Sequence, residues 1–122
     1  MDTNISFPSP DRRYRLDIFP QEMRMSHTVD CPYLVDNQTN DCLLELGGLW
    51  DASNVKWSKN SQTLSMNLRH YPDGSVVFLF VVDMVAGTAQ LSSAGYGVLL
   101  TGTMAGVVAE LQRTISLRTI FQ

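Results

Sequence analysis

The sequence predicts a mostly β (α+β) fold: two antiparallel three-stranded meanders that form a sheet or a sandwich, with a C-terminal helix packed on it. Short runs of alternating apolar and polar residues recur from Tyr14 to Leu91, each bounded by turn-forming residues. Apolar residues at helical spacing follow near the C-terminus. At 122 residues with 44% hydrophobic and 17% charged side chains, the chain is expected to form a single domain over residues 1–122.

In the first half, turn chemistry at Ser9–Arg13 precedes an alternating strand that begins at Tyr14. We expect Pro20 to end this strand, and Pro32 to bend the next one. Gly47 and Gly48 then break the pattern. The strands predicted in this half are 14–18, 23–29 continuing to 33–35, and 42–46.

The pattern begins again in the second half. The turns expected here are 58–61, 71–74 and 86–87. Residues 76–82 are apolar without interruption, which predicts a central strand covered on both faces. The strands predicted in this half are 55–57, 64–68, 76–82 and 88–91.

The two halves match each other at fixed spacings. The turn at Ser9 aligns with the turn at Ser58, 49 residues later, and Asp36 aligns with Asp83, 47 residues later. These spacings predict two copies of one three-strand unit, over about residues 7–46 and 55–91.

The matched segments also resemble a known family. Residues 7–14 (FPSPDRRY) and 56–64 (KWSKNSQTL) are similar to the W-S-P-D-G turn motif of TolB-type β-propeller blades, and residues 33–36 and 80–83 are similar to the third strand of those blades. Neither turn has the Gly, only the first has the Pro, and a closed propeller needs at least four blades. The resemblance implies two blade-like meanders that act as a binding scaffold, and it carries over no catalytic residue.

The C-terminal region has a different character, because no charged residue occurs from Met84 to Ala109. Its apolar part, residues 94–109, is shorter than the roughly 20 residues that span a membrane, so we expect a soluble helix over about 98–118 and no membrane partner. The alternation in residues 114–119 leaves a terminal strand as the alternative. The apolar face expected for the helix consists of Leu100, Met104, Val107, Val108, Leu111 and Ile115.

Cysteine use and the N-terminal residues bear on the compartment. Cys31 and Cys42 form no CxxC motif, and a turn at residues 37–40 would place Cys42 opposite Val35 rather than Cys31. We expect two free thiols. The first residues show no basic segment followed by an apolar run, so the sequence predicts a cytoplasmic protein.

Catalytic and cofactor signatures are missing from the sequence. The two histidines, His27 and His70, lie in no metal-binding spacing, and neither a phosphate-binding loop nor a nucleophile elbow occurs. We therefore expect no enzyme activity, no metal and no cofactor. A small unrecognised enzyme would need His27 together with Asp30 or Asp51.

With no enzyme activity expected, the sequence favours a binding function. The net charge of −3 argues against nucleic acid as the partner. Aromatic and acidic residues beside turns are the candidate partner-binding residues: Trp50, Asp51, Tyr71, Asp73 and Glu45. The alternative for Trp50 is a structural role that closes one end of the sheet. We expect a bacterial immunity protein that occludes a partner, a basic toxin domain. The second expectation is an assembly subunit that associates through strand edges.

Overall fold

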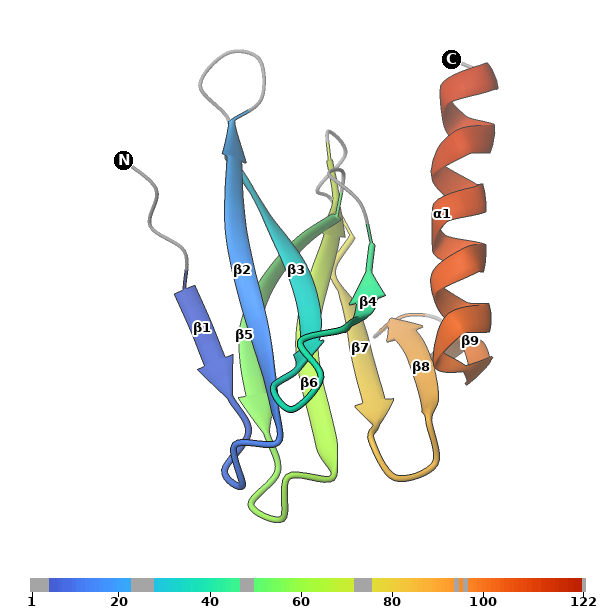
Figure 1. Cartoon of the computed structure of the whole chain (residues 1–122). Coiled ribbons are helices and arrows are strands. Elements are labelled where there is room, and N and C mark those ends of the chain that lie inside the picture. Colours follow the sequence, from blue (N-terminus) through green and yellow to red (C-terminus); the bar gives the residue numbers. More distant parts are fainter. Residues whose placement is uncertain are drawn as a thin grey trace.

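The computed structural model describes residues 5–22, 28–46, 50–71, 76–93, 95 and 97–121, with side chains of the C-terminal helix described as far as Gln112. Two antiparallel sheets and one helix make up this part of the chain (Figure 1). The mostly β prediction is confirmed. The elements are β1 Ile5–Pro8, β2 Tyr14–Glu22, β3 Thr28–Asp36, β4 Cys42–Glu45, β5 Trp50–Trp57, β6 Thr63–His70, β7 Phe78–Asp83, β8 Thr88–Ser93, β9 Gly97–Thr103 and α1 Met104–Phe121.

Both sheets are meanders in which each strand pairs with the next one along the chain. The first sheet has the order β1-β2-β3-β4 and the second has the order β5-β6-β7-β8-β9. The first sheet has one strand more than the three predicted for it, because β1 pairs with β2, and the second has one more than the four segments predicted, because β9 pairs with β8. Val35 pairs with Cys42 as expected, and both cysteines are free.

Two prolines lie inside strands that the sequence predicted they would end or bend. Pro20 pairs with Asp30 within β2, and Pro32 pairs with Ile18 within β3. At Pro20 the β1 ladder has already ended, and at Pro32 the β4 ladder has not yet begun. Among the described residues, each proline thus has a paired strand on one side only. On the other side its missing N–H need not break a ladder hydrogen bond.

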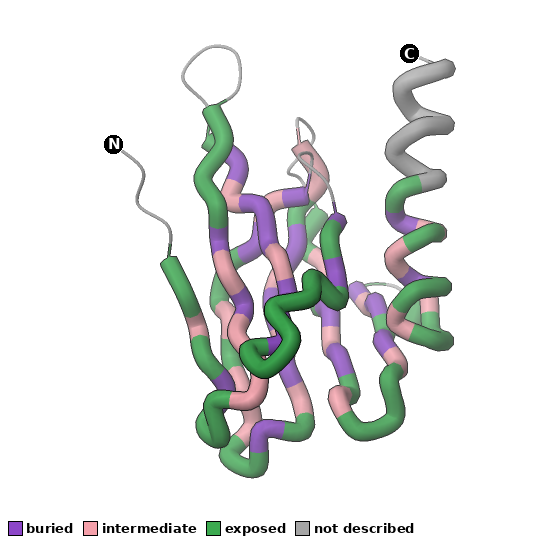
Figure 2. Tube along the Cα trace, in the orientation of Figure 1, coloured by how far each residue is buried: buried purple, intermediate pink, exposed green. Residues whose placement is uncertain are grey.

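The sheets pack face to face around one core. Apolar side chains of β2, β3 and β4 meet those of β5 to β8, and buried and exposed positions alternate along the strands (Figure 2). Among the polar contacts that join the sheets, the Trp57 indole N–H donates to the Phe7 carbonyl at 2.8 Å, and the Asp11 N–H donates to Ser61 Oγ at 2.9 Å. Trp57 is half-buried at the edge of the core.

The central strand of the second sheet is covered on one side only. Phe80 and Val82 of β7 are fully buried against the first sheet, whereas Leu79, between Phe78 and Phe80, is 44% exposed. The expectation of cover on both faces was wrong. β7 is apolar on both faces, but among the described residues only the face toward the first sheet is covered.

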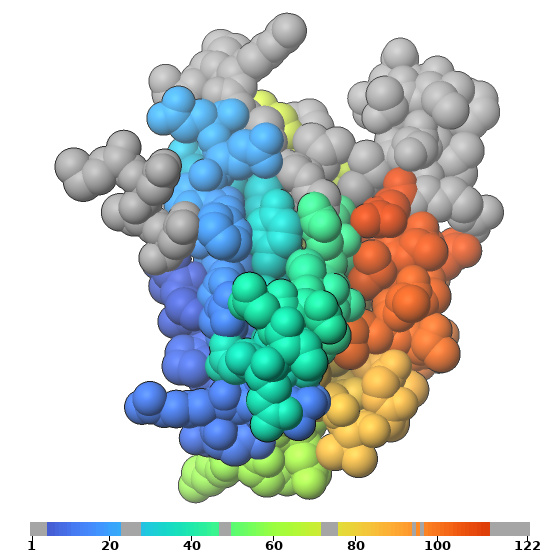
Figure 3. All heavy atoms as spheres, viewed as in Figure 1, coloured from blue at the N-terminus to red at the C-terminus, as the bar shows by residue number. Residues whose placement is uncertain are grey.

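The helix begins later than the sequence predicted. Residues 97–103 form β9, and the backbone is helical from Met104 to Phe121, so Leu100 lies in a strand and residues 114–119 are helical. Val107 and Leu111 are buried in the core. The helix contacts β8, β9 and β4, and Figure 3 shows it beside the first sheet. No described helix is long and apolar enough to cross a membrane.

A side-chain cap defines the start of the helix. Thr103 Oγ1 accepts a hydrogen bond from the N–H of Gly106 at 3.0 Å. A Cβ at residue 106 would stand 2.9 Å from that oxygen. A side chain at residue 106 would therefore crowd the cap, and Gly106 itself is exposed.

Removing this cap should weaken the helix. We expect Thr103→Ala to lower the free energy of unfolding by about 1 kcal/mol, because one N–H of the first turn loses its acceptor. Urea unfolding followed by circular dichroism measures the change. Thr101→Ala, an exposed threonine of the same strand, is the control and should change stability by less than about 0.5 kcal/mol. Equal losses in both variants would contradict the role of the cap.

The turns at Ser9 and Ser58 have the same hydrogen bonds. Each serine Oγ donates to the side chain two residues later, Asp11 or Asn60, at 2.7 and 2.6 Å. Each Oγ also accepts the N–H five residues later, at 3.1 and 3.0 Å. The fourth residue of each turn, Arg12 or Ser61, has a positive φ near 60°. The matched chemistry in the sequence therefore builds matched turns.

Candidate functional site

Of the predicted partner-binding residues, Trp50 lies in the core. It is 3% exposed, and its ring contacts those of His70 and Phe78 with centroid distances of 4.9 and 6.0 Å. The alternative interpretation, a structural Trp at one end of the sheet, agrees with this burial. In this structure Trp50 offers almost no surface to a partner.

The other predicted residues are dispersed. Asp51 is half-buried, and its Oδ1 accepts the Asp30 N–H at 2.7 Å, which joins β5 to β3. Glu45 is exposed on β4, and Tyr71 is half-buried after β6. Asp73 lies outside the described residues, as does His27.

Asp30 and Asp51, each expected as the partner that His27 would need in an enzyme, are joined by the hydrogen bond from the Asp30 N–H to Asp51 Oδ1. Burial, and then the charge of Asp51, raise the pKa of Asp30 above its usual value. The same causes raise the pKa of the Cys31 thiol, with burial again the larger. A thiol with a raised pKa is a poor nucleophile, so this cluster does not have the features of a catalytic site. Within the described ranges, no group of three His, Cys, Asp or Glu could hold a metal ion.

The raised pKa of Asp30 predicts a pH-dependent effect on stability. A carboxyl group whose pKa is raised by folding costs stability when it is ionised, and this cost disappears as the pH falls through its folded pKa. We expect Asp30→Asn to unfold at higher urea concentration than the wild type at pH 7, with the gap closing toward pH 3. Urea midpoints between pH 3 and 8 measure this. A gap that is independent of pH would show that the effect is not due to ionisation.

One surface brought together by the fold is the face of the second sheet that points away from the first sheet. We call its central part the open face, and define it by two residue pairs of the β6–β7 ladder and the residue across from Val81 on β8: Ser65, Asn67, Leu79, Val81 and Gln90. These five side chains are uncharged, and two charged residues border them: Lys56, which pairs with Ser65, and Asp83, two residues beyond Val81. Leu79 is 44% exposed, and Val81 is half-buried beside it.

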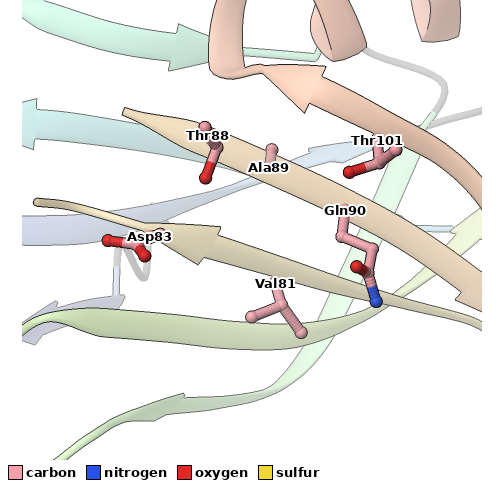
Figure 4. Close-up of a pocket in the computed structure, with 6 residues that line it drawn as sticks. All are labelled: Val81, Asp83, Thr88, Ala89, Gln90 and Thr101. Carbon is pink, nitrogen blue, oxygen red and sulfur yellow. The ribbon is translucent and has the colours of Figure 1, made fainter. Parts of the chain in front are cut away.

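A shallow pocket lies at one end of the open face (Figure 4). It has a volume of about 250 Å³ and is formed by β7, β8 and β9. Its lining residues are Val81, Asp83, Thr88, Ala89, Gln90 and Thr101. Asp83 Oδ1 already accepts the N–H groups of Val85 and Ala86 at 2.9 and 3.0 Å, so it stabilises the adjacent turn. The pocket is an indentation in the open face, with no nucleophile and base brought together in it.

Sequence reasoning missed the open face for a specific reason. Residues 76–82 are apolar at every position, so no alternation marks which side chains point outward. The signal lay on the neighbouring strand, where Ser65 and Asn67 alternate with buried Leu64, Met66 and Leu68. Pairing β7 with β6 would have placed Leu79 and Val81 on the polar side.

No protein-family model, curated protein or solved structure matches this chain. The similarity to TolB-type blades therefore stays a prediction from the turn motif.

Proposed function

We propose that the chain is a non-enzymatic protein-binding subunit that docks another protein on the open face of its second sheet. One observation carries the proposal: a sheet face with exposed Leu79 and half-buried Val81 at its centre, framed by the neutral polar side chains of Ser65, Asn67 and Gln90. Apolar centres with polar rims are typical of protein interfaces. This is the assembly role anticipated from the sequence, moved from the strand edges to a sheet face.

Affinity capture from the native cell tests this function. The bait is the wild-type chain, and the comparison baits are Leu79→Asp on the open face and Asn37→Asp, an exposed turn residue away from it. Proteins captured by the wild type and Asn37→Asp but lost with Leu79→Asp are then purified and titrated by calorimetry. A partner whose affinity is the same for all three baits would show that the open face is not the docking site.

The second candidate is the bacterial immunity protein expected from the sequence, which would neutralise a basic toxin by occluding it. The observation that favours it is a pair of carboxylates on the outer side of the first sheet, where Asp17 and Glu45 pair with Tyr33 from its two sides. Burial, and after it the charges of Glu45 and Asp17, raise the pKa of the nearby Cys42 thiol. Arg15 offsets part of this charge, since its Nε lies 2.9 Å from Asp17 Oδ2.

The immunity role has its own test. If a toxin encoded beside this chain is its partner, Glu45→Lys should weaken the complex and reduce the salt dependence of its affinity, because one attractive charge becomes repulsive. Leu79→Asp should leave that complex unchanged. A toxin complex that is indifferent to Glu45→Lys and lost with Leu79→Asp would favour the open face instead.

A further inference from the structure

The two sheets have the same strand register, counted from their matching turns. Leu16 pairs with Leu34 in the first sheet as Ser65 pairs with Val81 in the second. Two residues further along each ladder the pairs match again: Ile18 with Pro32, and Asn67 with Leu79. The ladders to β4 and β8 match as well, because Leu34 pairs with Leu44 as Val81 pairs with Gln90. The paired positions of β2, β3 and β4 therefore have equivalents in β6, β7 and β8, whereas β9 has no equivalent among the described strands of the first sheet.

This equivalence relates the open face to a face that is already buried. The open-face residues correspond one for one to the face with which the first sheet packs on the second. We call that the packed face; all its residues are buried, and they are Leu16, Ile18, Pro32, Leu34 and Leu44. The open face is thus the second copy of a surface that binds a sheet in the first copy.

The same register relates the other two faces. The second sheet meets the packed face with Leu64, Met66, Phe80, Val82 and Ala89, all of them buried. Their equivalents lie on the exterior side of the first sheet, which we call the outer face: Arg15, Asp17, Tyr33, Val35 and Cys42. Val35 is only 8% exposed there, and exposed Glu45 pairs with Tyr33 at the side of this face. Within the chain the two sheets therefore stack head to tail, because the face that the second sheet buries is not the equivalent of the face that the first sheet buries.

The two exterior faces differ from their buried equivalents in a similar way. On the strands that flank the centre, apolar residues are replaced by polar ones: Ser65, Asn67 and Gln90 on the open face, Arg15 and Asp17 on the outer face. On the central strands both faces stay apolar or aromatic. These central residues are Leu79 and Val81 on the open face, Tyr33 and Val35 on the outer face.

We propose that the open face binds the outer face of a second copy of this chain, which repeats between molecules the stacking seen within one. The inference rests on the proposed function, that the open face docks a protein, and names its partner. The apolar residues of β7 in one copy would meet those of β3 in the other. The neutral side chains of Ser65, Asn67 and Gln90 would face Arg15 and Asp17. Those two are already paired with each other, and Arg15 Nη2 also reaches Asn40 Oδ1 at 3.4 Å. The five residues of the open face carry no charge that would repel Arg15 or Asp17, and the positive charge of Lys56 beside them is opposite to that of Asp17 and of Glu45, which pairs with Tyr33.

A contact between two different faces repeats with every added copy. Such a head-to-tail contact gives a closed ring if the rotation closes and an open chain if it does not. Closed rings of packed antiparallel blades contain about four to eight sheets, which at two sheets per chain means about two to four copies. Each copy would use both faces.

Two variants, each disabling one face, test the proposal by sedimentation velocity. Leu79→Asp places a charge at the centre of the open face, and Cys42→Arg adds a bulky charge at an exposed position of the outer face. Gln90→Arg repeats the first change without removing an apolar side chain. Circular dichroism checks that each variant is folded. We expect the wild type to sediment as multiples of 13.6 kDa, and each variant alone to associate at least about tenfold more weakly.

The mixture of variants gives the decisive result. A Leu79→Asp chain retains an intact outer face and a Cys42→Arg chain retains an intact open face, so an equimolar mixture should form a 1:1 dimer that grows no further. Self-association by Cys42→Arg alone at wild-type strength would overturn the proposal, because that pattern requires like faces or the β9 edge to pair. A monomeric wild type would overturn it too. In that case the affinity capture described above would still decide whether the open face docks another protein.

Discussion

Trp50→Ala is expected to lower the free energy of unfolding by about 3 to 5 kcal/mol, measured by urea titration at neutral pH. The indole is 3% exposed and contacts the rings of His70 and Phe78, so its removal leaves a large void at one end of the second sheet. A loss of this size is a large fraction of the stability of a small domain. Any loss of partner binding by this variant would then follow from unfolding.

Trp50→Phe separates packing from hydrogen bonding. The indole Nε1 is buried and no described residue accepts a hydrogen bond from it. A phenyl ring keeps part of the aromatic packing and removes that unsatisfied donor, so Trp50→Phe should cost less than half as much as Trp50→Ala. A Trp50→Ala protein with wild-type stability would mean that the indole does not pack in the core, and Trp50 would return to the candidate binding residues.

The features that the sequence predicted best are those determined by short-range chemistry. The Ser9 and Ser58 turns are closed by hydrogen bonds that span five residues or fewer, so the residue types at those positions are enough to identify them. The pairing of Val35 with Cys42 follows from the turn between them for the same reason.

The features that it predicted poorly depend on distant neighbours. Whether a proline breaks a strand depends on how far the adjacent strands extend, and Pro32 is accommodated because the β4 ladder starts at Tyr33. Leu100 has helical spacing to Met104, yet it pairs with Leu91 in β9. The spacing could not reveal that β8 has an edge available there. Trp50 was ambiguous because its ring partners lie 20 or more residues away in the sequence.

The open face was only partly predictable from the sequence. Its polar half was visible as alternation in β6, but its apolar half was hidden in a continuous run, and only the β6–β7 register joins the two. Of the five predicted site residues, none lies on the open face as defined, since aromatic and acidic residues near turns were favoured over neutral residues in strands. A search for large interface anchors overlooks a face whose centre is Leu79 and Val81 between neutral polar side chains.

Phe80→Ala and Leu79→Ala provide the sharpest contrast, since the two residues are adjacent in β7 and point to opposite faces. Phe80 is fully buried between the sheets, and its loss should cost about 3 to 5 kcal/mol in urea unfolding of the isolated chain. Leu79 is 44% exposed, so Leu79→Ala should change stability by less than about 1 kcal/mol.

The same pair distinguishes a folding surface from a docking surface. Unfolding at a series of protein concentrations adds the free energy of association to that of folding, because a bound partner stabilises the folded state. Under the head-to-tail proposal, the urea midpoint of the wild type should rise with protein concentration, and that of Leu79→Ala should rise less. A Leu79→Ala protein as unstable as Phe80→Ala at the lowest concentration would show that Leu79 is part of the core, and that the second sheet has no open face.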